Sequence, residues 1–153
     1  MKIINNTDAL KEIIEKYKLD GRELSLIPTM GNLHNGHLSL IDKAPKGTVK
    51  LVTIYVNSLQ FDSHDDYNHY PRTIKDDIQK CREKNVDVVY APKLNISDEF
   101  DCKKNIDLPK FTRYLCGATR TNHFVGVFKI VKYLFSITNP DYACFGKKDF
   151  QQL

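Results

Sequence analysis

Residues 28–37, Pro28-Thr29-Met30-Gly31-Asn32-Leu33-His34-Asn35-Gly36-His37, connect a predicted strand to a predicted helix. The apolar run Leu24-Ser25-Leu26-Ile27 before them is typical of a buried strand, and the apolar residues that follow His37 lie at helical spacing. A glycine-containing loop that leads from a strand into a helix is a usual place for phosphates to bind in α/β proteins. The sequence therefore predicts a phosphate site at the start of this helix.

The two histidines of this stretch are the first candidate ligand-binding side chains. His34 and His37 are three residues apart, so both are expected on one side of the first helical turn. The free amides and the dipole at a helix N-terminus favour an anion, and two imidazoles add donors directed at the same place. Gly36 is expected to let the backbone approach the ligand. A zinc site that includes His64 and His69 is the alternative, but no Cys-x-x-Cys pair or His-Glu-x-x-His helix supports it.

The composition fits one globular domain. A length of 153 residues, 41% of them hydrophobic and 27% charged, provides a sizeable core and excludes disordered and fibrous proteins. No basic-then-apolar leader and no apolar run of membrane-spanning length is present, so a cytoplasmic protein without a membrane partner is expected. The net charge of +4 suits anionic small molecules, and no arginine-rich stripe with interleaved aromatic residues indicates nucleic acid as a partner.

The cysteines lie far apart in the sequence. Such spacing is typical of reduced thiols in the cytosol rather than of a disulfide framework. They are interpreted as small apolar side chains: Cys81, Cys102, Cys116 and Cys144.

The rest of the chain alternates between helical and strand patterns. This alternation predicts an α/β fold with a doubly wound parallel sheet. The expected elements are a helix over Leu10–Tyr17 capped by Thr7, a strand over Leu51–Val56, a helix over Thr73–Lys84 capped by Thr73, a strand over Val86–Tyr90, an irregular excursion over Asn95–Leu115 with one short strand, a helix that buries Phe124, Val127, Phe128, Val131 and Phe135, a strand over Tyr142–Phe145, and a helical turn at Phe150–Leu153.

Polar loops follow three of the predicted strands, at residues 28–37, 57–61 and 146–149. In an open parallel sheet, ligands bind outside the carboxyl ends of the strands, so the three loops are expected to line one crevice. Asp76 and Asp77 fall in the first turn of a predicted helix, where solvated acids are favoured, and metal binding is the alternative.

Four segments in this order closely resemble the pantoate–β-alanine ligase (pantothenate synthetase) family. A histidine-x-glycine-histidine box by itself indicates only the wider nucleotidylyltransferase superfamily, whereas the four segments together single out this member. The matching segments are Pro28–Gly31 with His34–His37, Val56–Phe61, Tyr70–Thr73 and Phe145–Leu153.

The resemblance implies that residues 1–153 are an N-terminal Rossmann-like domain that binds ATP and pantoate. Family members condense pantoate with β-alanine through a pantoyl-adenylate and release AMP and pyrophosphate. The resemblance also implies ATP as a substrate, Mg²⁺ as the metal and a homodimer as the assembly. The other histidine-box nucleotidylyltransferases, and a nucleotide-binding fragment without catalysis, are the alternative functions.

The resemblance also assigns site residues by their position in the matching motifs. It implies that His37, His34 and Lys148 are catalytic, with His37 commonly assigned as a proton donor, and it leaves the metal ligands unknown. The implied ATP contacts are Met30, Gly31, Asn32, Leu33, His34, Asn35, Gly36, His37, Gly146, Lys147, Lys148 and Asp149. The implied pantoate and β-alanine contacts are Gln60, Gln152, Asn57, Phe61, Arg120 and His123.

The chain departs from the family pattern in a few residues and in length. Ser58 replaces a common proline, Lys147 a common glutamate and Val125 a frequent arginine. The family normally continues into a second ATP motif, rich in serine and arginine, and a small C-terminal domain that closes over the site. Both are expected to be absent from this chain, and turnover by the fragment is therefore an open question.

Overall fold

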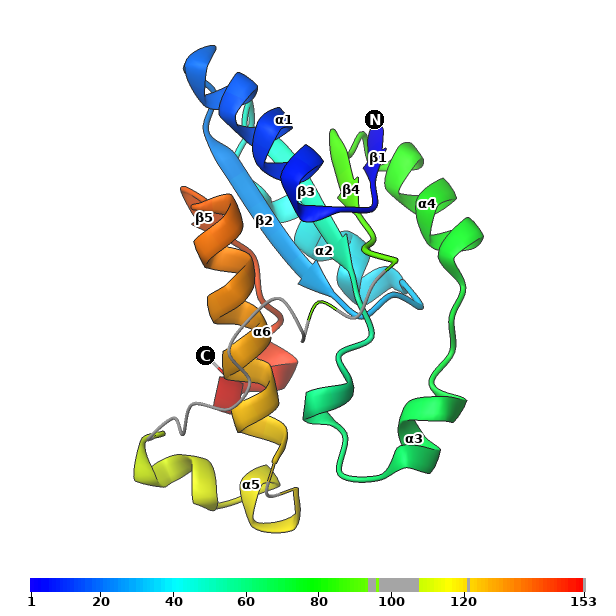
Figure 1. Cartoon of the computed structure of the whole chain (residues 1–153), viewed down its shortest axis with the longest axis vertical. Helices are drawn as coiled ribbons and strands as arrows, with labels where there is room; N and C mark the ends of the chain where they lie inside the picture. Colours follow the sequence, from blue (N-terminus) through cyan, green and yellow to red (C-terminus); the bar gives the residue numbers. More distant parts are fainter. Residues whose placement is uncertain (94–95, 97–107, 121, 153) are drawn as a thin grey trace.

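The computed structural model describes residues 1–93, 96, 108–120 and 122–152. Their strands form one parallel sheet in the order β1-β4-β3-β2-β5 (Figure 1). The α/β class and the parallel sheet predicted from the alternating pattern are therefore confirmed. The strands are β1 (Lys2–Ile4), β2 (Leu24–Thr29), β3 (Val49–Ile54), β4 (Val88–Tyr90) and β5 (Tyr142–Ala143).

Helices cover both faces of the sheet, with α1 and α6 on one side and α2 and α4 on the other (Figure 1). Alternate residues of each strand feed the two cores. In β2, for example, Leu24 and Leu26 pack with α1 and α6, whereas Ile27 packs with α2 and α4. The helices are α1 (Thr7–Leu19), α2 (Asn35–Lys43), α3 (His64–His69), α4 (Ile74–Glu83), α5 (Cys116–Thr119) and α6 (His123–Thr138), with 3₁₀ turns η1 (Ser58–Gln60), η3 (Lys110–Arg113) and η4 (Lys147–Gln152).

The strand order reverses direction between β2 and β5. Successive crossovers place β3 and β4 on one side of β2, and the chain then returns through α6 to add β5 on the other side. In open α/β sheets, this reversal opens a crevice at the carboxyl ends of the strands. The loop after β2 and the loop after β5 both start at this reversal point, because β2 and β5 are paired neighbours. That these two loops and residues 57–61 line one crevice stays a prediction.

Several boundaries differ from those predicted by the sequence pattern. The strand β1 and the short helix α3 were not expected, because three residues and six residues are too few for a clear periodicity. The strand β3 begins and ends two residues earlier than predicted, β4 begins two residues later but ends at Tyr90 as predicted, and β5 contains only Tyr142–Ala143. The short strand expected between 95 and 115 falls largely outside the described residues.

The predicted cap of α1 is wrong by one residue. Asn6 is the N-cap, because its side-chain oxygen accepts a hydrogen bond from the Ala9 amide at 2.8 Å. Thr7 is instead buried, and its hydroxyl bonds to the phenol groups of Tyr90 at 3.0 Å and Tyr133 at 2.9 Å. Thr7 therefore ties α1 to β4 and α6.

The buried face of α6 also differs from the predicted one. Phe124 is buried as expected, but Phe128 and Phe135 are 42% and 38% exposed. This helix is apolar around most of its circumference, so spacing alone does not identify the side that packs on the sheet. The buried residues that do so are Ile130, Tyr133 and Leu134, and the predicted Val131 packs against the same core while partly buried.

Of the cysteines in the described part of the chain, Cys81 is buried as predicted, Cys144 is partly buried and Cys116 is exposed. All three are free thiols. No helix among the described residues is both long enough and apolar enough to cross a membrane.

Gly126 allows α6 to approach the η1 turn closely. A Cβ at this position would lie 2.3 Å from the Leu59 carbonyl oxygen and 2.5 Å from the Gln60 amide nitrogen. Both neighbours are backbone atoms that cannot rotate away, so only glycine permits this contact. The close approach fixes η1, which carries Gln60, against the N-terminal half of α6.

We expect Gly126→Ala to lower the free energy of unfolding by about 1–3 kcal/mol, because overpacking against backbone outweighs the gain in helix propensity. Urea denaturation of both proteins measures this difference. Gly146→Ala is the matched control, since a Cβ at residue 146 would meet nothing within 4 Å. Equal losses in the two variants would contradict the proposed packing role.

Candidate active site

His34 and His37 lie side by side at the N-terminus of α2, as predicted. Their ring centroids are 4.2 Å apart. The Nδ1 atom of His34 accepts a hydrogen bond from the Gly36 amide at 3.1 Å, and the Nδ1 atom of His37 accepts one from the His34 amide at 3.4 Å. A neutral imidazole that accepts at Nδ1 carries its proton on Nε2. Both rings therefore carry an Nε2–H donor at the N-terminus of α2.

Gly36 has a structural role in this turn besides the predicted one. A Cβ at residue 36 would lie 2.8 Å from Cε1 and 3.0 Å from Nδ1 of His34. The missing side chain thus leaves room for the His34 ring to fold back and cap the helix.

Asp77 of α4 holds the loop that precedes the two histidines. Its carboxylate accepts hydrogen bonds from the backbone amides of Asn32 at 3.0 Å and Leu33 at 2.7 Å, and from the Thr73 hydroxyl at 3.1 Å. The Lys80 ammonium, one turn further along α4, donates to the Leu33 carbonyl at 2.6 Å. Two side chains of α4 thus fix both the amides and the carbonyl of this loop.

The interpretation of Asp77 as a solvated acid is wrong, whereas Asp76 is exposed as predicted. Asp77 is fully buried, and burial of a carboxylate is tolerated here because three donors solvate it. Thr73 occupies the N-cap position of α4, but its side chain makes no capping bond and donates to Asp77 instead. Sequence reasoning missed this role because it depends on α4 packing beside a loop 44 residues away.

Burial lowers the pKa of His37, and the neighbouring charges of His34 and Lys148 lower it further. Asp77 and Asp149 act in the opposite direction. Lys148 and Asp149 belong to η4, which follows β5, and β5 pairs with β2, so charges on the loop after β5 act on the histidine turn after β2. His37 is consequently a neutral donor near pH 7 when no anion is bound.

The loop after β5 provides an exposed cation beside the histidines. The Lys148 side chain is 82% exposed, and its ammonium lies 3.9 Å from the Asp149 carboxylate. Lys147 is also exposed, and Gly146 is partly buried. A weak, solvated ion pair of this kind leaves Lys148 able to reach an anionic ligand.

Gln60 is held in η1 by an amide network. Asn57 is buried, and its Nδ2 group donates to Gln60 Oε1 at 3.1 Å and to the Gly126 carbonyl at 3.0 Å. Its Oδ1 atom accepts from the Leu59 amide at 3.3 Å. The structure therefore shows Asn57 orienting Gln60, and its predicted contact with a substrate stays a prediction.

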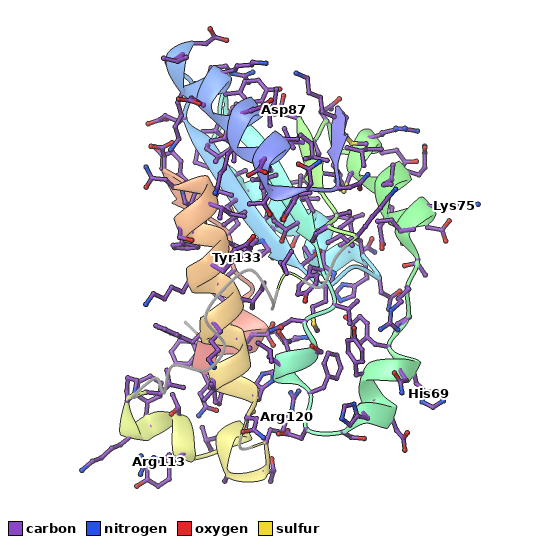
Figure 2. All side chains as sticks on the ribbon, viewed as in Figure 1. His69, Lys75, Asp87, Arg113, Arg120 and Tyr133 are labelled. Atoms are coloured by element: carbon purple, nitrogen blue, oxygen red, sulfur yellow. The ribbon has the colours of Figure 1, made fainter. Side chains whose placement is uncertain are left out.

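Arg120, which follows α5 and is labelled in Figure 2, and His123, the first residue of α6, both contact the backbone of Gln60. The Gln60 carbonyl accepts from the Arg120 guanidinium at 3.2 Å and from His123 Nδ1 at 3.1 Å. Because a carbonyl only accepts, the His123 proton is on Nδ1, and Nε2 carries a lone pair when the ring is neutral. Burial lowers the pKa of His123, the Arg120 charge lowers it further, and the bond to Gln60 opposes both.

Met30 and Phe61, two apolar residues among the implied ligand contacts, have different environments. Met30 lines a cavity of about 580 Å³, together with Tyr55, Val56 and Arg72. Phe61 does not line it, and its ring packs edge-on against Tyr67 and Tyr70, at 5.6 Å between centroids in each case. The side chain of Gln152 lies outside the described part of the structure.

The zinc alternative receives no support from the arrangement of ligands. His69 is on α3, at the outer edge of the molecule in Figure 2, and its Nδ1 atom bonds to the Asp65 carbonyl at 2.8 Å. Among the described residues, no group of three or more histidine, cysteine, aspartate or glutamate side chains is placed to hold a metal ion.

Comparisons with known proteins identify relatives over the whole chain. The family model described as pantoate-beta-alanine ligase matches residues 2–153. A pantothenate synthetase of Vibrio atlanticus is 46% identical over 95% of this chain, and that of Vibrio vulnificus strain YJ016 is 43% identical over all of it. These alignments cover 50% and 52% of the relatives, so the chain spans about half their length.

Solved structures agree with this finding. The pantothenate synthetase of Thermus thermophilus superposes with a TM-score of 0.88 at 32% identity, covering 99% of this chain and 54% of that one. The pantoate-beta-alanine ligase of Francisella tularensis, complexed with beta-gamma ATP and beta-alanine, superposes with a TM-score of 0.92 at 34% identity, covering 99% of this chain and 59% of that one. The predicted fold and resemblance are both confirmed.

We expect Asp77→Asn to lower the free energy of unfolding by about 1–3 kcal/mol, because an amide group cannot accept from all three donors. Urea denaturation measures the loss, and hydrogen exchange at the Asn32 and Leu33 amides locates it. Asp76→Asn, an exposed neighbour on the same helix, is the control. Unchanged protection of the two amides in Asp77→Asn would show that the carboxylate does not hold this loop.

We expect the free energy of unfolding to decrease as the pH falls below 6.5, the ordinary pKa of histidine. The pKa values of His37 and His123 are lowered in the folded protein, so the unfolded chain binds more protons in that range. The stabilisation is complete above pH 6.5 and declines as the pH drops towards the folded-state values. An NMR titration of the imidazole Cε1–H resonances checks whether His37 and His123 cause this loss of stability. Midpoints at or above 6.5 for both rings would contradict the assignment.

Proposed function

This chain belongs to the pantoate-beta-alanine ligase family, and we propose that it forms the part of such an enzyme that binds ATP and pantoate and joins them as pantoyl-adenylate. β-Alanine then displaces AMP to give pantothenate. The observation that carries the proposal is the convergence of the His34–His37 turn and the Lys148 loop at the reversal point of the sheet. The Gln60 network lies at the same end of the strands.

The first step needs no general base. The carboxylate of pantoate is already ionised at neutral pH, so it can attack the α-phosphate of ATP directly. The barrier lies in the repulsion between two anions and in the charge that develops on the leaving pyrophosphate. The groups required are therefore donors and cations fixed around the phosphates.

His34, His37 and Lys148 have the chemistry for this task. The backbone amides that bind Nδ1 of each histidine orient its Nε2–H outward, so the two donors need no reorganisation when a phosphate arrives. An incoming polyanion also raises the pKa of His37, which allows this ring to bind with a full charge or to give a proton to pyrophosphate. Lys148 adds a charge from the opposite loop.

Gln60 is proposed to bind pantoate. Its Oε1 atom is occupied by Asn57, whereas its amide nitrogen makes no hydrogen bond to any described residue. The free NH₂ group suits the carboxylate and hydroxyl oxygens of pantoate. Gln152, Arg120, His123 and Phe61 are proposed as further substrate contacts on the strength of the family motifs alone.

Mg²⁺ is proposed to enter with ATP. The described residues contain no cluster of three side chains able to cage a metal. Such a cage is unnecessary, because Mg²⁺ bound to a nucleotide keeps mainly phosphate and water oxygens as ligands. The ion would neutralise phosphate charge, and no protein ligand is assigned to it.

The acyl-adenylate formed in the first step must be kept from water until the amine attacks. We propose that the segment matching the other half of the relatives closes over the crevice, and that the protein acts in the cytoplasm as a homodimer. Residues 1–153 would then be the nucleotide- and pantoate-binding domain of the enzyme.

We expect pyrophosphate release from ATP and Mg²⁺ that depends on pantoate, and a decrease of about a hundredfold or more in His37→Ala because a preorganised donor is lost. An enzyme-coupled phosphate assay measures the release. His64→Ala, which removes an exposed histidine of α3, is the matched control.

Each other outcome points to a different function. ATP binding without release would make this chain a nucleotide-binding fragment. Release that does not require pantoate would favour another nucleotidylyltransferase, and an unchanged rate in His37→Ala would refute the role of the histidine turn.

A further inference from the structure

We propose that Gln151 is a positioning residue that couples the ATP side of the crevice to the pantoate side. It follows Lys148 and Asp149 in η4 and contacts the segment that leads to Arg120. The inference deepens the proposed function and depends on it for its meaning, since it concerns how two substrate loops are held in register.

Both the oxygen and the nitrogen of the Gln151 side-chain amide form hydrogen bonds to residues much earlier in the sequence. Its Nε2 group donates to the carbonyls of Phe111 at 3.1 Å and Tyr114 at 2.8 Å, and its Oε1 atom accepts from the Cys116 amide at 3.2 Å. Three hydrogen bonds thus join η4 to a segment 35 to 40 residues earlier. All of the bonded groups on that segment are backbone atoms, so the contact sets the path of the chain rather than a side-chain orientation.

The backbone at Leu115 agrees with this function. Leu115 has a φ of +50° and a ψ of −119°, which glycine adopts readily and leucine rarely does. Its side chain is 80% exposed, so no burial of leucine compensates for this conformation. The Tyr114 carbonyl and the Cys116 amide flank this residue, and both bond to Gln151. The Gln151 amide therefore stabilises the turn in the shape that the strained residue requires.

A short series of hydrogen bonds connects the turn at Leu115 to Gln60. The Arg120 amide bonds to the Cys116 carbonyl at 2.9 Å, which closes α5 directly after the turn. The Arg120 guanidinium then donates to the Gln60 carbonyl at 3.2 Å, and His123 donates to the same oxygen. Lys148 and Gln60 are in this way connected through Gln151, although they lie on loops after different strands.

This coupling matters because the proposed reaction joins a ligand of one loop to a ligand of the other. Attack of a carboxylate on a phosphate is fast only when the two anions are held in line at close range. A residue that fixes the distance between the two loops then affects ligand binding and turnover without touching either substrate.

The test compares the variants Gln151→Met and Gln79→Met. Methionine keeps the length of the glutamine side chain but cannot make the amide hydrogen bonds of Gln151. Gln79 is an exposed glutamine of α4 that bonds only to Glu83 among the described residues, at 3.0 Å. In the 153-residue chain without ligand, we expect Gln151→Met to accelerate hydrogen exchange at the amides of Cys116, Arg120 and Asp149. We also expect ATP to bind about tenfold more weakly, with an unchanged urea midpoint.

The outcomes separate this inference from the proposed function. Faster exchange confined to Cys116, with Arg120 and Asp149 unchanged, would overturn the coupling, and so would unchanged ATP affinity in Gln151→Met. If the parent chain does not bind ATP, the proposed function fails, and the exchange at Arg120 and Asp149 alone decides whether Gln151 couples the two loops. Equal effects of Gln79→Met on hydrogen exchange and ATP affinity would show that the Gln151 contact has no specific coupling role.

Discussion

The buried carboxylate of Asp77 is the constraint on which the rest of the site depends. A charge without solvent must be surrounded by donors, and the donors here are the amides of Asn32 and Leu33 and the Thr73 hydroxyl. Satisfying this charge therefore determines the path of the loop between β2 and α2. The histidine turn begins directly after that loop, so α4 positions the N-terminus of α2.

The position of Gln60 depends on a different constraint, the close packing of backbone between η1 and α6. Gly126 lets α6 approach η1, and Asn57 spans the contact by donating to both Gln60 and the Gly126 carbonyl. Neither residue needs to touch a substrate to be required. Both arrangements hold a candidate binding side chain by one end. His34 and His37 are held at Nδ1 and Gln60 at Oε1, which leaves Nε2 of each side chain as a preorganised donor.

The sequence predicted the α/β fold and the histidine turn because both have local signals. Hydrophobic runs mark the strands, and two histidines three residues apart must share one side of a helical turn. Asp77, Gly126 and Gln151 have no local signal, since the loop, turn and segment that they hold lie 35 to 67 residues away in the sequence. The buried face of α6 was mispredicted for a related reason: when most of a helix is apolar, the choice of face is made by the neighbouring elements.

Histidine acts in two different ways within this one crevice. His34 and His37 accept hydrogen bonds from backbone amides at Nδ1, so each carries its proton on Nε2. His123 instead donates a hydrogen bond from Nδ1–H to a carbonyl, so its Nε2 atom carries a lone pair. The lowered pKa of His37 and that of His123 keep both rings neutral near pH 7, and the backbone partner alone decides which ring donates and which accepts. The proposed binding of phosphate on one side and of an amine or hydroxyl group of a substrate on the other would use both types. The fold obtains them from the same residue by changing only the backbone group behind the ring.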